Sequence, residues 1–424
     1  MVNWHIGITT AAKGRGFPNT VMGELEDISA QLPVAQADGC AIAGTSLSTN
    51  LVESRGEKGI VPSMALVAIA FAAVVIGLAL ATEGLSQGDF RVFYDAAIRL
   101  RQGEPLYEPG PMAYMNPPFF AWAIQPLTWM SYTLARLVWI LITYGATVLS
   151  CTLLFGEKST GHWRSFWLWA SLLSVPAVVG NVVTGQNTAL VLLGLALNYA
   201  LQRNDRPVWA GAALGLVLIK PHLIIGPAIV LLAGKNWRAL LGLGISAIVL
   251  GTGSMFLVGT SGVASYLNVA RDVAGWVHLD QFFRLDMHTP NAILHTLAPQ
   301  AADVAVVVVG GVVAIFLAWR ASQARAYTAE TASLAVVASL LITPYAHLHD
   351  LMILVVPWIL LGPRVSGPKL WVLLASYVAP VLHLIMMGMG GYGPILTVTA
   401  LAGMFAMLAH RRQSATAKPL KSGA

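Results

Sequence analysis

The chain has 424 residues, of which 56% are hydrophobic and only 10% are charged. A typical soluble domain has roughly 25% charged residues, so this composition excludes an ordinary soluble protein. The formal net charge of +6 does not indicate a nucleic-acid partner, because basic residues occur singly or in pairs between apolar blocks and form no stripe with interleaved aromatic residues.

The first 58 residues differ from the rest. They are rich in Gly, Ala, Ser and Thr, and they contain no signal-peptide hydrophobic region. We predict that residues 1–58 are either a disordered cytoplasmic tail or the product of a start codon assigned too far upstream. A transmembrane domain at 59–411 and a second cytoplasmic tail at 412–424 follow.

The first predicted span and the loop after it differ clearly in polarity. Residues 60–82 carry no charge over about the ~20 residues that cross a bilayer core. Residues 83–116 are polar, and Gly88-Asp89 predicts a helix start with Asp89 as the N-cap. Hydrophobic residues then recur with the spacing of one helix face, at Phe90, Phe93, Ala97 and Leu100. This pattern predicts an amphipathic helix that lies in the membrane interface.

Eleven further apolar blocks follow, at 117–131, 134–155, 166–183, 188–201, 208–233, 239–258, 301–319, 331–344, 348–361, 370–387 and 394–410. The fold class is therefore an all-α polytopic membrane protein with about twelve transmembrane helices. Several blocks are short, which predicts broken or re-entrant helices. A second polar interruption lies at 259–300.

Basic residues predict the orientation of these spans. They precede the first span at Arg55 and Lys58 and flank every second later turn, at Lys235 and Arg238, Arg320 and Arg325, Arg364 and Lys369, and Arg411 and Arg412. The positive-inside rule then places both termini in the cytoplasm and both long polar loops outside. Two topologies remain open for 117–233. In one, 117–155 crosses the membrane once and 208–233 is broken at Lys220-Pro221, which places the basic residues at 158–164 and 203–206 inside. In the other, these basic residues are not inside.

Ionisable groups near hydrocarbon cost about 2.5–3.5 kcal/mol each, so those that persist usually mark a pathway or a site. Four clusters qualify: Asp89 with Arg91, Tyr94 and Asp95; Gly185-Gln186-Asn187; Lys220-Pro221-His222; and the segment Pro344 to Asp350 with His347 and His349. Each has a simpler explanation. Asp89 fits a helix cap, Lys220 can extend to an interface, the two histidines can be hydrated interface residues, and Gln186-Asn187 can join helices by hydrogen bonds.

Two kinds of site are disfavoured. Asp95 lies roughly 240° around the helix from Asp89, so the two carboxylates do not form a pair on one face. The sequence His347-Leu348-His349-Asp350 resembles a metal-binding pattern, but no second ligand group follows at zinc-like spacing. We therefore predict no metal and no cofactor.

Several segments follow one another in a characteristic order. They are Gly88 to Ala97, Gly103 to Tyr107 and Tyr114 to Phe119 in the first outer loop, then Gly185-Gln186-Asn187, Gly211 through Lys220-Pro221, and Pro344 with His347 and His349. This ordered set resembles glycosyltransferase family 87. That family includes polyprenyl-phosphate-mannose-dependent α-mannosyltransferases with the C-type glycosyltransferase fold.

The resemblance implies an enzyme that moves a hexose, such as mannose, from a polyprenyl-phosphate donor to a glycolipid or glycan acceptor, with inversion, on the outer face of a bacterial plasma membrane. Asp89 takes the position of the catalytic base. Lys220, His347 and His349 match positions suited to the donor phosphate, and substrate binding is expected of Gln186, Asn187, Arg91 and Tyr94. The chain departs from the family pattern at His288 to Ala292, where an Asn-x-Ser stretch is common, so the acceptor is the least transferable part.

Two other functions remain alternatives. A transporter or flippase for lipid-linked or small polar substrates also places polar residues in broken helices. Transporters often contain two related halves, whereas residues 60–240 and 240–410 show no convincing match. A membrane scaffold without catalysis predicts that Asp89, Lys220 and His347 are freely replaceable.

Overall fold

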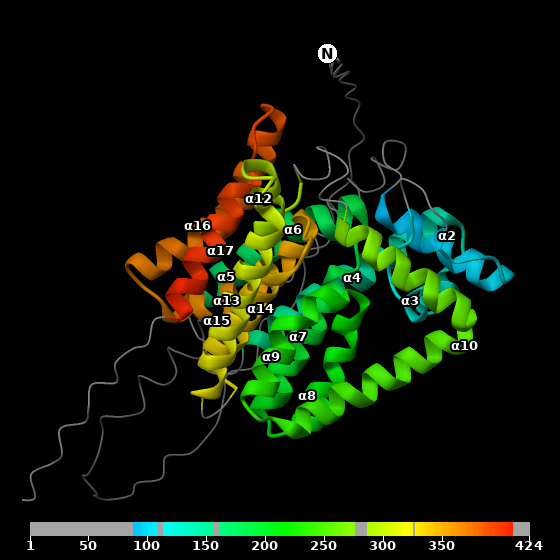
Figure 1. Cartoon of the computed structure of the whole chain (residues 1–424). Coiled ribbons are helices and arrows are strands. Elements are labelled where there is room, and N and C mark those ends of the chain that lie inside the picture. Colours follow the sequence, from blue (N-terminus) through cyan, green and yellow to red (C-terminus); the bar gives the residue numbers. More distant parts are fainter. Residues whose placement is uncertain (1–87, 108–112, 156–161, 276–285, 325–326, 410–424) are drawn as a thin grey trace, which may run out of the picture. The chain divides into compact units, whose positions relative to one another are not determined.

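The structure, a computed structural model, describes residues 88–107, 113–155, 162–275, 286–324 and 327–409, which belong to one compact unit, Leu66–Ala424. Within these ranges every regular element is a helix (Figure 1). The predicted all-helical class is therefore confirmed for this part of the chain. The predicted first span at 60–82 and the tails at 1–58 and 412–424 lie outside the described residues.

Four of the described helices are long and apolar enough to cross a membrane: Tyr132–Phe155, Trp237–Asp272, Ala302–Ser322 and Pro368–Gly388. A fifth span is possible if the pair Ser165–Leu172 and Val175–Thr184, bent by 47°, counts as one. The predicted number of twelve is not confirmed by these helices.

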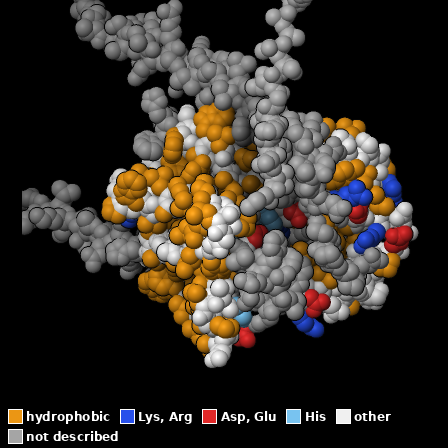
Figure 2. All heavy atoms as spheres, turned by 90° about the horizontal axis from the view of Figure 1, so that it is seen from above, with side chains coloured by type: hydrophobic (Ala, Val, Ile, Leu, Met, Phe, Trp, Pro, Cys, Tyr) orange, Lys and Arg blue, Asp and Glu red, His pale blue; other side chains and the backbone are white. Residues whose placement is uncertain are grey.

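The surface of these helices is apolar. Phe256 is 92% exposed and Val307 is 74% exposed, which is unfavourable in water but natural against lipid. Figure 2 shows hydrophobic side chains over much of the described surface, whereas Lys, Arg, Asp and Glu side chains gather toward one side. The composition and these helices together fit a multi-pass membrane protein.

The predicted amphipathic helix is α2 (Asp89–Gln102), whose buried face includes Phe90, Phe93 and Ala97. It packs on α3 (Pro118–Ile124) and the 3₁₀-helix η1 (Gln125–Trp129). The prediction that Asp89 is the N-cap is wrong. Gly88 occupies that position, and no side chain caps the helix. A Cβ on Gly88 would lie 2.8 Å from the carbonyl oxygen of Thr184, so close packing requires glycine there.

The next elements are α4 (Tyr132–Phe155), α5 (His162–Leu172), α6 (Val175–Val178), the π-helical turn η2 (Val179–Thr184) and α7 (Thr188–Arg203). The helical path breaks at Gly185, which has a φ of 70°. The indole of Trp139 in α4 donates a hydrogen bond of 2.7 Å to the carbonyl of Gly185. The polar segment that includes Gln186 and Asn187 is thus an interruption in a helix, as its sequence indicated.

Residues 207–233 form a broken unit of α8 (Pro207–Ala213), η3 (Leu214–Ile219), η4 (Pro221–Ile224) and α9 (Ile225–Ala233). Lys220 lies at the break, because Pro221 disfavours helical backbone at the residue before it. The amide of Asn236 donates to Gln202 at 3.0 Å, so the two ends of this unit meet. Residues 207–219 and 221–233 therefore form a hairpin with Lys220 at its tip.

The second half begins with α10 (Trp237–Gly275), which is longer than the predicted block because it continues past a non-helical Gly259. The remaining helices are α12 (Pro290–Leu297), α13 (Ala302–Ser322), α14 (Ala329–Ile342), η6 (Leu348–Leu354), α15 (Val355–Leu361), η7 (Gly362–Arg364), α16 (Pro368–Gly388) and α17 (Pro394–Ala409). Helix α14 is buried along almost its whole length and packs against α9, α13, α15 and α17. The segment 343–347 after α14 reaches the candidate site.

Candidate active site

A polar cavity of about 310 Å³ lies where four interruptions of the helical pattern meet. These are the start of α2, the break after η2, the tip of the 207–233 hairpin and the segment after α14. The polar side chains that line it are Asp89, Asn116, Thr184, Gln186, Lys220, His222, Tyr266, Asp286, Tyr345, His347, His349 and Asp350. Residues up to 261 positions apart in the chain, from 89 to 350, therefore share one cavity.

The structure brings five of the eight predicted site residues to this cavity, namely Asp89, Gln186, Lys220, His347 and His349. Asn187 lies directly behind the lining. Its side chain is fully buried and donates a hydrogen bond of 3.0 Å to Asn116, which does line the cavity.

Arg91 and Tyr94 lie on other faces of α2. The guanidinium of Arg91 pairs with Asp95 at 2.8 Å on the exposed side, and the hydroxyl of Tyr94 donates to the carbonyl of Met130 at 2.8 Å. At ~100° per residue these positions are turned well away from Asp89, so α2 cannot present all three side chains to one cavity.

Two glycines hold Asp89 at the cavity. Gly88 packs against the backbone of Thr184, and a Cβ on Gly185 would lie 2.7 Å from the Cβ of Phe90. The start of α2 is thereby pressed against the break between η2 and α7. Asp89, in the first turn of α2, is partly exposed and lines the cavity, so its carboxylate can contact a ligand there.

Lys220 has a buried counter-charge. Its Nζ lies 2.6 Å from Oδ1 of Asp350, and the two side chains are only 8% and 1% exposed. The Asp350 carboxylate also accepts hydrogen bonds from the backbone N–H of His347 at 3.0 Å and from the hydroxyl of Thr188 at 3.4 Å. Asp350 was not predicted as a site residue. Charged residues in apolar segments usually pair with one another, so the opposite charges of Lys220 and Asp350 would have suggested this ion pair.

Asp286 joins two histidines. Its Oδ2 lies 3.2 Å from Nδ1 of His347, and its Oδ1 lies 3.3 Å from Nε2 of His383. Burial acts to raise the pKa of the Asp286 carboxyl, but the hydrogen bonds from His347 and His383 outweigh it and hold that pKa below its usual range. Burial acts to lower the pKa of His347, and Asp286 outweighs this effect and raises it. His347 therefore tends toward its cationic form beside the cavity.

His222 offers two further hydrogen-bonding atoms. Both of its ring nitrogens are buried and have no hydrogen-bond partner among the described residues. Its ring centre lies 4.3 Å from that of Tyr345. Since unpaired polar atoms that line a cavity are usually satisfied by a ligand or water, His222 is a further candidate binding residue that sequence analysis placed only in a cluster.

An apolar groove of about 950 Å³ adjoins the polar cavity through Ile219, which lines both. The groove runs between α3, α4, η3 and α10, with Phe119, Trp122, Leu216 and Phe256 among its lining residues. Trp122 is 58% exposed and Phe256 is almost fully exposed, so the groove has an apolar rim. A single elongated ligand with a polar end and a long apolar tail matches this combination.

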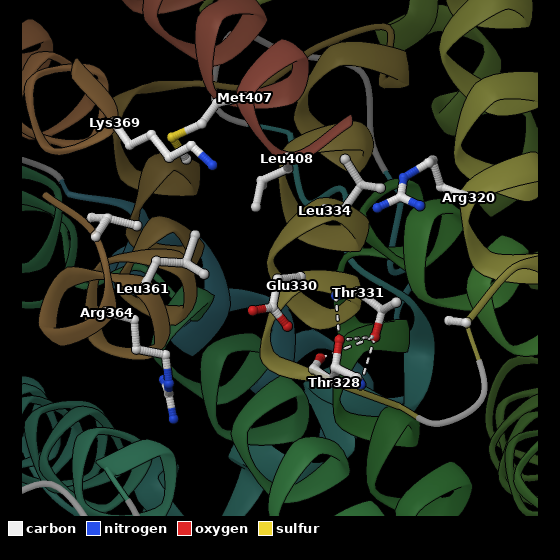
Figure 3. A pocket seen from close by; sticks show the side chains of 12 residues that line it. Arg320, Thr328, Glu330, Thr331, Leu334, Leu361, Arg364, Lys369, Met407 and Leu408 are labelled. Carbon is white, nitrogen blue, oxygen red and sulfur yellow. Dashed lines mark hydrogen bonds between the residues drawn. The ribbon is translucent and has the colours of Figure 1, made fainter. Parts of the chain in front are cut away.

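A third cavity, of about 480 Å³, has a different character. It is lined by the basic side chains of Arg320, Arg364 and Lys369 together with Glu330 (Figure 3). This basic cavity lies at the start of α14, whereas the polar cavity follows the end of α14. A helix of 14 residues is about 20 Å long, so α14 separates the two cavities by most of a bilayer core.

The sequence profile of glycosyltransferase family 87 matches residues 114–344, which is more than half of the chain. The chain belongs to glycosyltransferase family 87. The predicted membership of this family is thereby confirmed, and the protein is a glycosyltransferase. The match includes Gln186, Lys220 and Asp286 of the polar cavity, whereas Asp89 lies 25 residues before its start and His347 lies three residues after its end. No curated protein and no solved structure gives a significant match.

Proposed function

We propose that this family 87 glycosyltransferase moves a hexose, with mannose as the first candidate, from polyprenyl phosphate to a glycolipid or glycan acceptor. In this proposal the chain has the C-type glycosyltransferase fold with about twelve spans. The observation that carries the proposal is the junction at Ile219 of a polar, charged cavity with a large apolar groove.

The donor fits this junction with its two chemically different parts. The polyprenyl chain lies in the groove, whose apolar walls and exposed rim suit a lipid that enters from the side. The phosphate lies among Lys220, His347 and His349, and His222 supplies further hydrogen bonds. Because Asp350 balances the charge of Lys220, we expect Lys220, His347 and His349 to hold the phosphate together rather than Lys220 alone.

The transfer is a single displacement. The acceptor hydroxyl oxygen bonds to the anomeric carbon while the bond from that carbon to the phosphate oxygen breaks, and Asp89 takes the hydroxyl proton. The cationic side chains stabilise the charge that develops on the departing polyprenyl phosphate. Attack from the face opposite the leaving group inverts the anomeric centre, so a β-linked donor gives an α-linked product.

The arrangement of basic residues supports an active site on the outer face of a bacterial plasma membrane. Gln202 and Asn236 join the two ends of the 207–233 hairpin, which places the neighbouring basic residues at 203–206 and 235–238 at one end. The basic cavity lies across α14 from Asp89. By the positive-inside rule the basic ends are cytoplasmic, and so are both termini.

Reconstituted protein with radiolabelled polyprenyl phosphomannose and mixed lipid acceptors tests the proposal. We expect label in a new glycolipid, together with released polyprenyl phosphate. Movement of intact donor between leaflets without transfer would instead identify a flippase. The absence of both transfer and movement with any polyprenyl phosphohexose would contradict the proposal.

A further inference from the structure

His288 has an unusual environment for a histidine. Its side chain is fully buried, yet neither ring nitrogen has a hydrogen-bond partner among the described residues. The backbone around it is well anchored: the N–H of His288 donates to Ala346 at 2.7 Å, and the amide of Asn291 donates to Pro344 at 2.8 Å. A buried polar group without a partner costs about 1–3 kcal/mol, so the fixed ring calls for an explanation.

Two other potential ligands face the same space as His288. Oδ1 of Asp286 lies 4.0 Å from Nε2 of His288 and 3.3 Å from Nε2 of His383. His383 is also fully buried, and its Nδ1 faces Gly393, where a Cβ would lie only 2.6 Å away. One ligand atom from each of the three residues lies within 4.8 Å of the others.

These separations suit a metal ion. Two ligands at ~2.0–2.1 Å from a tetrahedral zinc ion lie about 3.3 Å from each other. The Asp286–His383 separation of 3.3 Å matches this value, and the Asp286–His288 separation of 4.0 Å is longer. Two imidazoles and one carboxylate are a common three-ligand set for zinc, with the fourth position left to water. A substrate phosphate is a poorer occupant, because His288 and His383 do not line the polar cavity.

We propose that Asp286, His288 and His383 bind a zinc-like divalent cation. The site joins the segment before α12 to the C-terminal part of α16, because His383 follows Asp286 by 97 residues in the chain. It uses Oδ1 of Asp286 and leaves Oδ2 for Nδ1 of His347, which lines the polar cavity. The ion thus fixes the carboxylate that orients His347, since carboxylates that bind a metal are themselves held by hydrogen bonds from neighbouring residues. Asp286 is a positioning residue in this arrangement.

The sequence predicted no metal, because no second ligand group follows His347-Leu348-His349-Asp350 at zinc-like spacing. The proposed ligands are separated by most of α12 to α16 and have no local spacing pattern. The proposal does not depend on the identity of the sugar donor, and its test measures metal directly.

The test is zinc binding by the full-length protein in detergent. After equilibration in a zinc buffer and removal of free metal, we expect one equivalent of zinc in the wild type. His288→Gln and His383→Gln should each weaken zinc affinity by at least about tenfold, the low end of what loss of a supporting residue costs at a metal site. His295→Gln is the matched control, because His295 is also buried but pairs with Asp303 at 3.1 Å instead.

X-ray absorption at the zinc edge of the wild type makes the test independent of whether the variants fold. We expect two imidazole nitrogens and an oxygen at about 2.0–2.2 Å. A wild type that retains no zinc, or zinc affinity unchanged in both His288→Gln and His383→Gln, would overturn the proposal. Asp89→Asn should bind zinc normally, so a failure of sugar transfer and a failure of the metal site give different results.

Discussion

Breaking the Lys220–Asp350 ion pair tests how the polar cavity is built. Lys220→Met leaves a carboxylate that is 1% exposed without its cation, and Asp350→Asn leaves the ammonium without its anion. Removal of one partner from a buried pair typically costs about 3–5 kcal/mol of unfolding free energy, or roughly 10²- to 10⁴-fold in the unfolding equilibrium. We expect each single variant to lose an amount in this range.

The double variant Lys220→Met with Asp350→Asn should be more stable than either single variant. It contains no isolated buried charge, and replacement of a complete buried ion pair is often neutral. The asparagine oxygen can still accept the hydrogen bond from the backbone N–H of His347, and its NH2 group can donate to the hydroxyl of Thr188. The fold therefore requires matched charge at this position more than it requires charge itself.

Equilibrium unfolding in mixed micelles, followed by tryptophan fluorescence, measures these free energies. The exposed pair Arg91–Asp95 provides the control, because its side chains are 49% and 40% exposed and such pairs contribute about 0–1 kcal/mol. If the losses of the two single variants simply add in the double variant, the ion pair does not have the importance assigned to it.

Two further predictions use glycines of α10 with neighbours on the same helix as controls. Gly253→Phe should fill the apolar groove and raise KM for a long-chain donor more than for a short-chain one. Gly251 also has open space around it but does not line the groove, so Gly251→Phe should leave KM unchanged. Equal effects of the two substitutions on KM would contradict the groove assignment. Gly242→Ala should lower the unfolding free energy by about 1–3 kcal/mol, because the new Cβ would collide with the carbonyl of Val208. Gly244 has open space around it, so Gly244→Ala should not lower the unfolding free energy. Thermal unfolding compares the two variants, and unchanged stability of Gly242→Ala would refute the close packing of α8 and α10.

The helices were predictable from local pattern because each depends on neighbouring residues. The predicted blocks at 188–201, 370–387 and 394–410 correspond to α7, α16 and α17 within a few residues. The same holds for α2, whose buried face follows the helical repeat of Phe90, Phe93 and Ala97. The N-cap was misplaced by one residue, because the decisive contact is between Gly88 and the distant Thr184.

The candidate site was only partly predictable, because its pairings are long-range. Lys220 was recognisable as a charge in an apolar block, but its partner Asp350 is 130 residues away, and sequence alone does not show that the two meet. The same applies to Asp286, whose contacts with His347 and His383 span 61 and 97 residues. Conversely, Arg91 and Tyr94 are close to Asp89 in sequence, but the geometry of α2 directs them elsewhere.

The most direct measurement of the central claim is sugar transfer by Asp89→Asn, with Asp95→Asn as the matched control on the same helix. Both substitutions remove one carboxylate, but only Asp89 lines the polar cavity, whereas Asp95 pairs with Arg91 on the exposed face. Loss of the general base typically lowers the rate about 10²–10⁴-fold. We expect a loss of this size for Asp89→Asn, with unchanged thermal unfolding, and near wild-type transfer for Asp95→Asn. Transfer at the wild-type rate by folded Asp89→Asn would contradict the assignment of Asp89 as the catalytic base.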